Sequence, residues 1–448
     1  MPELRLHNFV TKRRETLVPI EPGHVRIYCC GPTVYDLAHI GNARPAVIYD
    51  VLTRVLRLLF PRVTYVRNVT DIDDKINNRA REQGVPIGEI TERTLADYRA
   101  DIAALGNLPP DVEPRATETI AEIIVLIERL IASGHAYAAE GHVLFSVPSF
   151  SQYGAFSGRS PDELLAGARV DVAPYKRDAG DFVLWKPSTP DLPGWDSPWG
   201  RGRPGWHIEC SAMSWRHLGE NFDIHGGGTD LIFPHHENEI AQSLCAFPGS
   251  RFARMWVHNG MLVINGEKMS KSLGNFVTIH ELLTTDAFGG RPWPGAVLRL
   301  AMLRTHYRQP IDFTVKSLEE AERALLDWRK AAEGVAPGAP GENVVAALAD
   351  DLNTPRAISE LHVLKAKDPA ALLGGLSLLG IDLASLPQET RAVEASVFEK
   401  AMALVAEREA ARRAKNWAES DRLRAALAAM GVALRDDRGG GTTWEFRP

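Results

Sequence analysis

The sequence is poor in cysteine, has no long apolar run and carries no excess of positive charge. Only four of the 448 residues are cysteines, and they are scattered: Cys29, Cys30, Cys210 and Cys245. This excludes a disulfide framework and leaves metal binding or quiet burial as the expected roles. No apolar segment reaches the roughly 18 residues of a membrane span. Because the N-terminal segment also has no signal-peptide core, we expect a cytoplasmic protein without membrane contact.

The formal net charge of −6 argues against a general nucleic-acid coat protein. It does not exclude a specific RNA contact through a local basic face. No P-loop and no G-x-G-x-x-G fingerprint is present. The length, with 45% hydrophobic and 24% charged residues, predicts an ordinary globular protein of two to four domains.

A strand–helix–strand pattern opens the chain. Residues 24–30 predict a strand, apolar residues at helical spacing follow as far as Leu59, and residues 63–69 predict a second strand. This order indicates a βαβ unit and a parallel sheet of the nucleotide-binding type. From about residue 80 to 200 the pattern predicts an insertion, and beyond Arg291 it predicts helices. Gly431 is placed to terminate the last helix.

The strongest local signal is PHHENE, residues 234–239. Pro234 suits the first position of a helix, which puts His235 and Glu239 four residues apart on one helical face. An imidazole and a carboxylate so placed are two ligands of a zinc site. The alternative is a surface capping cluster. A metalloprotease HExxH motif is excluded because Ile240 stands where its second histidine belongs.

Two cysteines are candidates to complete this set. Cys30 ends a predicted strand, and Cys210 lies in the strand-like run GWHIECSAM. Sites in parallel sheets form at strand ends, where residues distant in sequence meet. Cys29 and Cys30 point to opposite faces of a strand, so at most one of them serves, and the pattern does not choose between them. Buried, unreactive cysteine is the alternative for each.

Two further motifs favour phosphate binding. HIGN (39–42) opens a helix, where free N–H groups and the helix dipole favour phosphate, and His39 can donate to phosphate oxygens. KMSKS (268–272) lies between glycines and is expected to form a mobile loop. Its Lys268 and Lys271 are placed to neutralise the β- and γ-phosphates of ATP.

A glycine triplet lies in FDIHGGGTDL (222–231), next to His225 and Asp230. Glycines allow close approach of the backbone to a ligand. A tight surface turn is the alternative, but the position just ahead of residues 234–239 favours a functional role.

Together these residues resemble the cysteinyl-tRNA synthetases, within the class I aminoacyl-tRNA synthetases. The resemblance covers nearly the whole chain. It includes CGPTVYDLAHIGNAR (30–44), YVRNVTDIDDKI (65–76), GARVDV (167–172), DFVLWK (181–186), GRPGWHIECSAM (202–213), FDIHGGGTDLIFPHHENEIAQS (222–243), EKMSKSLGNF (267–276) and the tail from Trp417 to Trp444.

The resemblance implies one zinc ion per chain, held by Cys30, Cys210, His235 and Glu239, and so favours Cys30 over Cys29. It implies Mg²⁺ with ATP. The residues expected at ATP, cysteine or the adenylate are His39, Gly41, Asn42, Thr70, Trp206, His225, Gly226, Gly227, Asp230, Lys268 and Lys271. Asn42 replaces the histidine that commonly ends the tetrapeptide. Since asparagine cannot carry positive charge, we expect a weaker or redistributed phosphate interaction.

The implied fold is α/β. A Rossmann-like parallel-sheet catalytic domain with an α/β insertion precedes a C-terminal helical bundle and a small C-terminal tail domain. The expected boundaries are 1–95 (catalytic, first half), 96–200 (insertion on the acceptor-stem side), 201–290 (catalytic, second half), 291–395 (tRNA-binding helical bundle) and 396–448 (anticodon-binding region).

The implied reaction activates L-cysteine with ATP to cysteinyl-adenylate and pyrophosphate, then transfers cysteine to the 3′ end of tRNA(Cys), with zinc selecting the thiolate. The expected partners are tRNA(Cys), ATP and L-cysteine, and we expect a monomer. One rival is a ligase that passes cysteine to an amino-sugar and has no anticodon domain. Another is a non-catalytic RNA-binding relative with a purely structural zinc.

Overall fold

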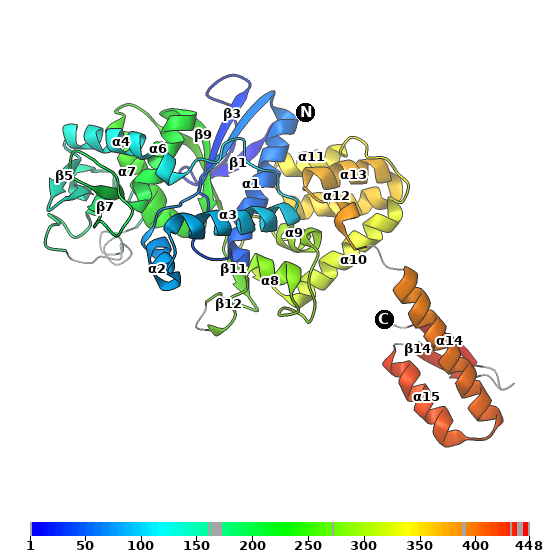
Figure 1. Cartoon of the computed structure of the whole chain (residues 1–448). Helices are drawn as coiled ribbons and strands as arrows, with labels where there is room; N and C mark the ends of the chain where they lie inside the picture. The colour runs from blue at the N-terminus through cyan, green and yellow to red at the C-terminus, as the bar shows by residue number, and fades with distance from the viewer. Residues whose placement is uncertain are drawn as a thin grey trace. The chain divides into compact units, whose positions relative to one another are not determined.

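The predicted βαβ unit is present near the N-terminus (Figure 1). In the computed structural model of the chain, β3 (His24–Cys29) is followed by α1 (Ile40–Leu59) and β4 (Arg62–Arg67), and the two strands pair in parallel. The structure describes residues 2–159, 163, 173–270, 273–387, 391–430, 432–436 and 442–446. It divides into two compact units, residues 1–385 and 386–448.

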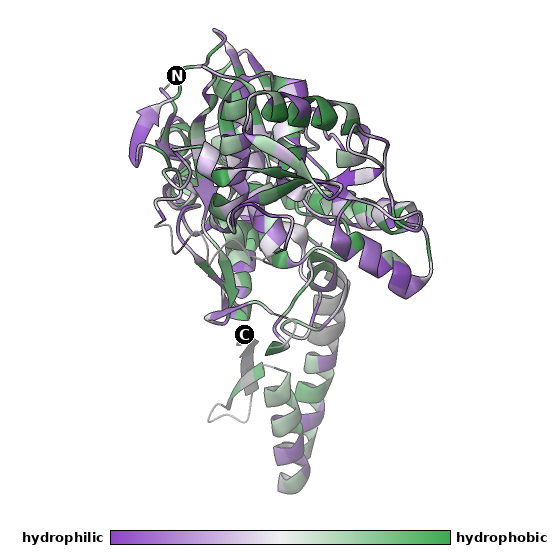
Figure 2. Cartoon of the chain, turned by 90° about the vertical axis from the view of Figure 1, so that its left-hand side faces the viewer, coloured by the Kyte–Doolittle hydropathy of each residue, from purple (hydrophilic) through white to green (hydrophobic). Residues whose placement is uncertain are grey.

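A parallel sheet forms the centre of the larger unit. Its strand order is β10-β9-β3-β4, with β9 (Asn221–Gly228) beside β3 and β10 (Phe252–Asn259) at the edge. α1 covers one face, and α6 (Trp206–Leu218) and α7 (Glu237–Ala246) cover the other (Figure 1). Because helices cover both faces, nearly all residues of β3, β9 and β10 are buried. Figure 2 shows green, hydrophobic segments on both the helices and the strands of this unit.

The insertion predicted between the two halves of the sheet contains a sheet of its own. Its antiparallel order is β5-β6-β7-β8. Its strands are β5 (Ala136–Ala139), β6 (His142–Phe145), β7 (Phe182–Pro187) and β8 (Gly202–Pro204). The helices between β4 and β5 are α2 (Asp74–Gln83), α3 (Ile87–Ala104) and α4 (Ile120–Ala132). A short hairpin, β1 (Arg5–Asn8) with β2 (Arg13–Thr16), precedes the central sheet.

A small three-stranded sheet follows β10 in sequence and contains the first residue of KMSKS. β11 (Leu262–Ile264) pairs antiparallel with β12 (Glu267–Lys268) and parallel with β13 (Ile311–Phe313). The prediction of helices alone beyond Arg291 is therefore wrong at β13, because three residues are too few to show a strand pattern. The helices after KMSKS are α8 (Ile279–Thr284), α9 (Gly295–Leu303), α10 (Val315–Ala331), α11 (Glu342–Ala349), α12 (Thr354–Lys367) and α13 (Pro369–Leu378).

The smaller unit pairs two helices with a hairpin. They are α14 (Arg391–Arg413), α15 (Trp417–Ala429), and the antiparallel strands β14 (Val432–Asp436) and β15 (Thr442–Phe446). Gly431, predicted to end the last helix, lies outside the described residues.

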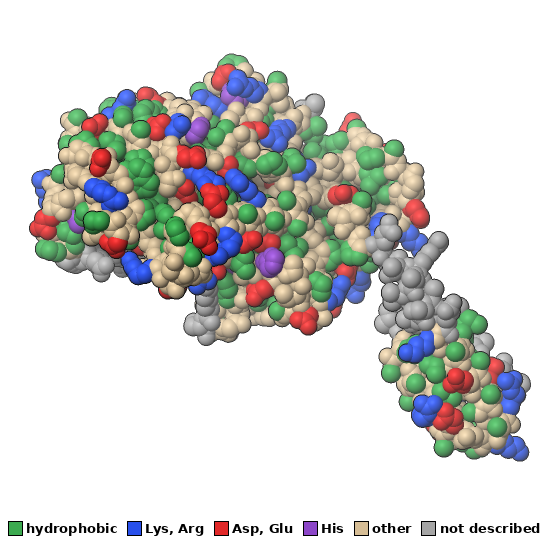
Figure 3. Space-filling model, in the orientation of Figure 1, with side chains coloured by type: hydrophobic (Ala, Val, Ile, Leu, Met, Phe, Trp, Pro, Cys, Tyr) green, Lys and Arg blue, Asp and Glu red, His purple; other side chains and the backbone are tan. Residues whose placement is uncertain are grey.

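The surface of the larger unit mixes charges of both signs on the face shown in Figure 3. Within the described parts of the chain, no helix combines the length and apolar character that crossing a bilayer requires.

Candidate metal and nucleotide sites

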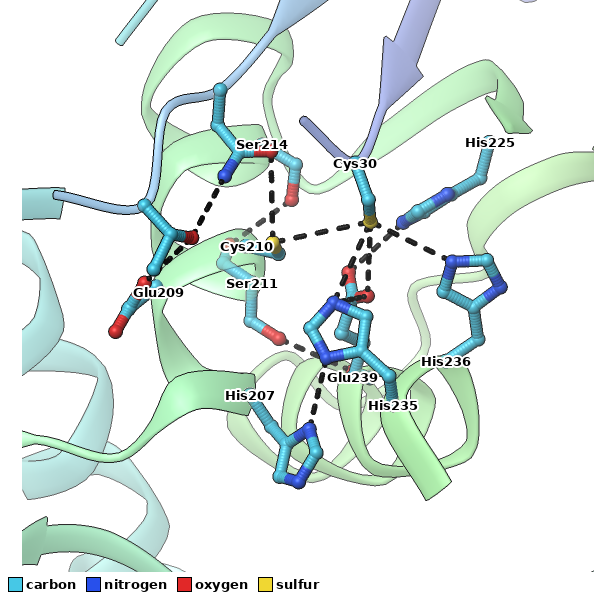
Figure 4. A network of polar contacts seen from close by, with 12 residues as sticks. Cys30, His207, Glu209, Cys210, Ser211, Ser214, His225, His235, His236 and Glu239 are labelled. Atoms are coloured by element: carbon cyan, nitrogen blue, oxygen red, sulfur yellow. Dashed lines mark hydrogen bonds and ion pairs between the residues drawn. The ribbon is translucent and has the colours of Figure 1, made fainter. Parts of the chain in front are cut away.

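Three remote segments bring sulfur, nitrogen and oxygen donors together beside the central sheet (Figure 4). Cys30 directly follows β3, and Cys210 lies on α6. His235 and Glu239 come from a π-helical turn (Ile232–His236) and the helix α7 that continues it. All four are buried or nearly so. The structure thus brings Cys30, rather than Cys29, to the other three candidates.

Two local predictions about these segments are wrong. Cys210 lies on a helix and not on a strand, because the alternating apolar residues that suggested a strand fill too short a window to exclude a helix. The helix predicted to begin at Pro234 begins at Glu237, after the π-helical turn, and the Phe233–Pro234 peptide bond is cis. The predicted proximity holds nevertheless, since His235 Nε2 lies 3.0 Å from Glu239 Oε1.

The separations between the donor atoms match those around one tetrahedral zinc ion. Zinc–ligand distances of about 2.0–2.3 Å place tetrahedral ligands roughly 3.3–3.8 Å apart. Cys30 Sγ lies 3.9 Å from Cys210 Sγ, 3.5 Å from His235 Nε2 and 3.6 Å from Glu239 Oε1. The donor set therefore fits zinc in both geometry and ligand type.

A second set of donors overlaps the first. It shares Cys30 and Glu239 but replaces the other two ligands with His225 and His236. Its His236 Nε2 lies 3.6 Å from Cys30 Sγ, and its His225 Nε2 lies 2.9 Å from Glu239 Oε2. The geometry alone thus allows either set to hold one ion.

A shell of rings, mostly absent from the sequence prediction, surrounds the donors. His207 Nδ1 lies 2.9 Å from His235 Nδ1, so the other nitrogen of His235 faces the donor cluster. His258 Nε2 lies 2.9 Å from His236 Nδ1. Trp206, predicted near the substrate, stacks on His235 with ring centroids 4.3 Å apart. Such outer contacts orient ligating imidazoles. In the sequence, His207 is indicated by its position next to Trp206, and His236 by its position next to His235.

Burial and mutual charge set the protonation of the cluster. Although burial opposes it, the Glu239 carboxylate raises the pKa of His235 to about 10. Burial also opposes ionisation of Glu239, yet His225 and His235 hold its pKa well below the usual range. A hydrogen bond from the Cys30 thiol lowers the pKa of Cys210. Burial raises the pKa of the Cys30 thiol well above the usual range. Glu239 and Cys210 therefore favour the anionic form that binds metals, whereas metal binding would release protons from Cys30 and His235.

The glycine triplet is the buried end of β9 and not a surface turn. A Cβ on Gly226 would lie 2.3 Å from the Tyr49 ring, and one on Gly227 would lie 2.8 Å from the His236 ring. The Tyr49 hydroxyl also accepts from Gly227 N–H on this strand (2.7 Å) and donates to Val257 O on the neighbouring strand β10 (2.6 Å). Glycine is thus required here because side chains of α1 and of the donor cluster press on the strand from its two faces.

Thr70 and Asp230, which are also predicted to lie near the substrate, differ in burial. Thr70 is buried, and its hydroxyl lies 3.2 Å from Glu209, the residue before Cys210. Burial raises the pKa of Glu209 well above the usual range, which favours the protonated carboxyl. Asp230 follows β9 in a 3-10 turn and is exposed.

The HIGN and KMSKS segments contact each other. His39 is the N-cap of α1, and its ring packs edge-on against Phe276, with ring centroids 5.4 Å apart. Asn42 Oδ1 accepts from the His39 backbone N–H at 3.2 Å, so this asparagine caps the helix. A Cβ on Gly41 would lie 3.4 Å from Met269. Lys268 ends β12 and is exposed, and Lys271 lies outside the described residues.

A segment of the insertion covers the helix that carries the ligands. Glu237, fully buried on α7, accepts hydrogen bonds from Gly154 N–H (2.9 Å) and Ser157 N–H (2.8 Å). Tyr153 donates to Asn238 Oδ1. Glu237 and Asn238, which lie between the candidate ligands His235 and Glu239, therefore bind this segment of the insertion to α7.

Two family models match the chain. The class I (C) tRNA synthetase catalytic domain matches residues 16–323, and the cysteinyl-tRNA ligase anticodon binding domain matches residues 397–444. Among solved structures, a Mycobacterium tuberculosis methionyl-tRNA synthetase with methionyl-adenylate has a TM-score of 0.51 at 17% identity, covering 80% of this chain and 89% of that one. A LeuRS–tRNA–LeuAMS complex from Agrobacterium radiobacter has a TM-score of 0.55 at 12% identity, covering 81% and 83%. These likenesses concern the fold.

Curated relatives match from end to end. The cysteine–tRNA ligase of Methylocella silvestris is 67% identical over 447 residues, which cover 99% of this chain and 100% of the relative. That of Acidiphilium cryptum is 60% identical over 455 aligned positions, covering 99% of each. The matched anticodon binding domain argues against the amino-sugar ligase, which would lack one. The chain belongs to the cysteinyl-tRNA synthetase family of class I aminoacyl-tRNA synthetases.

Proposed function

We propose that this cysteine–tRNA ligase selects its amino acid with one zinc ion, held by Cys30, Cys210, His235 and Glu239. The supporting observation is the close approach of side chains from three remote segments: four donor pairs lie 3.0–3.9 Å apart, and all the donor atoms lie within 4.8 Å of one another. We prefer this set to the overlapping one because it contains two thiols, which favour zinc over harder cations. Its histidine is also oriented by His207.

Selection by sulfur meets an energetic requirement that packing alone does not. Cysteine and serine differ by one atom, and a methylene-sized packing difference supplies only about 1–3 kcal/mol. Rejection of serine by 10⁴–10⁵ requires roughly 5–7 kcal/mol. When bound, zinc supplies a soft Lewis acid that prefers a thiolate to a hydroxyl. This selectivity in binding removes the need for an editing domain.

The protein groups around the cluster prepare this selection. Four protein ligands normally close a zinc site, so a substrate sulfur needs either a fifth position or the release of one ligand. Glu239 is the ligand that we assign to release, because His225 and His235 still neutralise its carboxylate when it is not on the ion. Trp206, about 40% exposed, forms the wall over His235. Thr70, His225, Gly226, Gly227 and Asp230 are the further residues that we assign to cysteine or the adenylate.

Adenylate formation relies on positioning and charge neutralisation rather than on a protein nucleophile. In our proposal the start of α1, with His39 and Gly41, receives the phosphates of ATP, which enters with Mg²⁺. Lys268 and Lys271 neutralise the leaving pyrophosphate. Asn42 uses its oxygen to cap the helix, so only its amide N–H groups are left for phosphate. The smaller unit binds the anticodon region of tRNA(Cys), whose 3′ end takes the cysteine.

The test compares cysteine- and serine-dependent ATP–pyrophosphate exchange, and tRNA(Cys) charging, in zinc-loaded, chelated and zinc-reloaded protein. We expect chelation to reduce the cysteine-over-serine ratio of kcat/KM by at least about 100-fold, and zinc to restore it. A chelated protein with unchanged selectivity would refute the role of zinc. Failure to charge tRNA(Cys) by protein that still activates cysteine would contradict the assignment of the acceptor.

A further inference from the structure

Arg44 is a fully buried arginine two residues after the HIGN tetrapeptide. Its Nη1 donates to Met261 O at 2.6 Å, and its Nη2 donates to Gln309 O at 2.5 Å, with Tyr307 O at 3.3 Å. Within the described residues no carboxylate forms an ion pair with it. Burial lowers the pKa of Arg44 to about 10, so the guanidinium remains charged at neutral pH. Burying a cation whose partners are all backbone carbonyls costs free energy. We therefore expect Arg44 to serve the segments that its hydrogen bonds join.

These carbonyls belong to the two segments at the base of the KMSKS hairpin. Met261 lies between β10 and β11, the first strand of that hairpin, and Tyr307 and Gln309 lie between α9 and β13, the strand that pairs with β11. The two segments also bond to each other, through Gly260 N–H to Tyr307 O (2.8 Å). Arg44 therefore joins α1 to the point where both supporting strands of the hairpin begin.

The chain that leaves the KMSKS loop is also bound to the start of α1. Ile40 N–H donates to Val277 O at 3.0 Å, and Ile279 N–H donates to Ala38 O at 2.9 Å. Within the loop, Ser270 N–H donates to Asn275 Oδ1 at 2.8 Å. The N-terminal part of α1 thus holds the loop at both its entry and its exit, with Arg44 as the side chain at the entry.

We propose that Arg44 is a positioning residue for adenylate formation: its buried guanidinium fixes the base of the KMSKS hairpin relative to the helix that begins at HIGN. This inference rests on the proposed roles of His39, Lys268 and Lys271 at ATP. The hairpin base determines where Lys268, at the end of β12, lies relative to the helix N-terminus. A displacement of about 1 Å in a reacting geometry costs on the order of 100-fold in rate.

The test uses Arg44→Lys and Arg44→Met. Lysine keeps the charge but has no fork to hold both segments, whereas methionine keeps volume alone. We expect the kcat of ATP–pyrophosphate exchange to fall about 10-fold for lysine and about 100-fold for methionine. Zinc content and the KM for cysteine stay unchanged. Transfer from preformed cysteinyl-adenylate to tRNA also keeps its rate, because the β- and γ-phosphates have already left.

Arg299→Lys is the matched control. Arg299 is also fully buried, on α9, and donates to Leu105 O (3.1 Å) and to Asp50. It holds α1 to the helices that follow, away from the hairpin base. We expect this variant to lose stability but keep its exchange rate at temperatures where it is folded.

Three outcomes would overturn the inference: Arg44→Met exchanging at the wild-type rate, Arg44→Met losing exchange and transfer by the same factor, or Arg299→Lys losing exchange as Arg44→Lys does at equal folded fraction. Lys268→Ala and Lys271→Ala separate this inference from the proposed function. If they slow exchange while Arg44→Met does not, only the role of Arg44 fails. If they too exchange at the wild-type rate, the assignment of the ATP site fails.

Discussion

Replacing His225 with alanine is expected to weaken zinc binding although His225 is not among the proposed ligands. Its Nε2 lies 2.9 Å from Glu239 Oε2, and both side chains are fully buried. Its ring stacks on Trp256 with centroids 4.3 Å apart, which fixes the direction of the hydrogen bond. Without this donor, Glu239 keeps His235 as its neutralising neighbour but is free to turn away from the ion.

Two independent estimates give the size of the effect. Loss of an outer-shell partner typically costs 10–100-fold in metal affinity, or about 1.4–2.7 kcal/mol. A hydrogen bond to a charged group contributes about 1.5–3 kcal/mol. We therefore expect the Kd for zinc to rise between 10- and 100-fold in His225→Ala. His225→Gln, which keeps an amide donor, should lose less.

The measurement is competition for zinc against a chromogenic chelator at fixed pH and salt. His217→Ala is the control, since His217 lies half-buried on the same helix as Cys210 and outside both candidate donor sets. It should bind zinc as the wild type does. A wild-type Kd in His225→Ala would refute the idea that the Glu239 orientation depends on this histidine.

Two further variants test other parts of the site. Lys271→Ala should slow ATP–pyrophosphate exchange strongly and leave zinc content intact, as measured by exchange kinetics and elemental analysis; equal loss of both would point to misfolding instead. Glu237→Ala removes the acceptor for Gly154 and Ser157 N–H, so urea unfolding should show a loss of about 3 kcal/mol. An unchanged midpoint would show that the covering segment is held by other contacts.

Periodicity in the sequence predicts individual helices and strands, and which residues lie close together along them. The strand at 24–30, the helix to Leu59 and the proximity of His235 and Glu239 all follow from periodicity and are confirmed. The run around Cys210 predicts a strand where the structure has a helix, because short apolar runs do not distinguish strand from helix. Periodicity does not predict the strand order β10-β9-β3-β4, because this order depends on pairings between strands that a long insertion separates in sequence.

The ring shell and Arg44 were also not predicted, for a different reason. A histidine that orients another histidine, as His258 does for His236, has no characteristic spacing in sequence. The partners of Arg44 are backbone carbonyls, which any residue type supplies. The two roles become visible only when the distances are known.

The proposed ligands lie on both sides of the insertion, and this affects when the protein can acquire its metal. Cys30 emerges early in synthesis, whereas a nascent chain shorter than 239 residues lacks Glu239. In the proposed arrangement, such a nascent chain lacks one of the four ligands and cannot hold zinc with full affinity, so we expect capture to follow assembly of both halves of the sheet. Refolding followed with a zinc-sensitive dye should show uptake after most of the helical signal has returned.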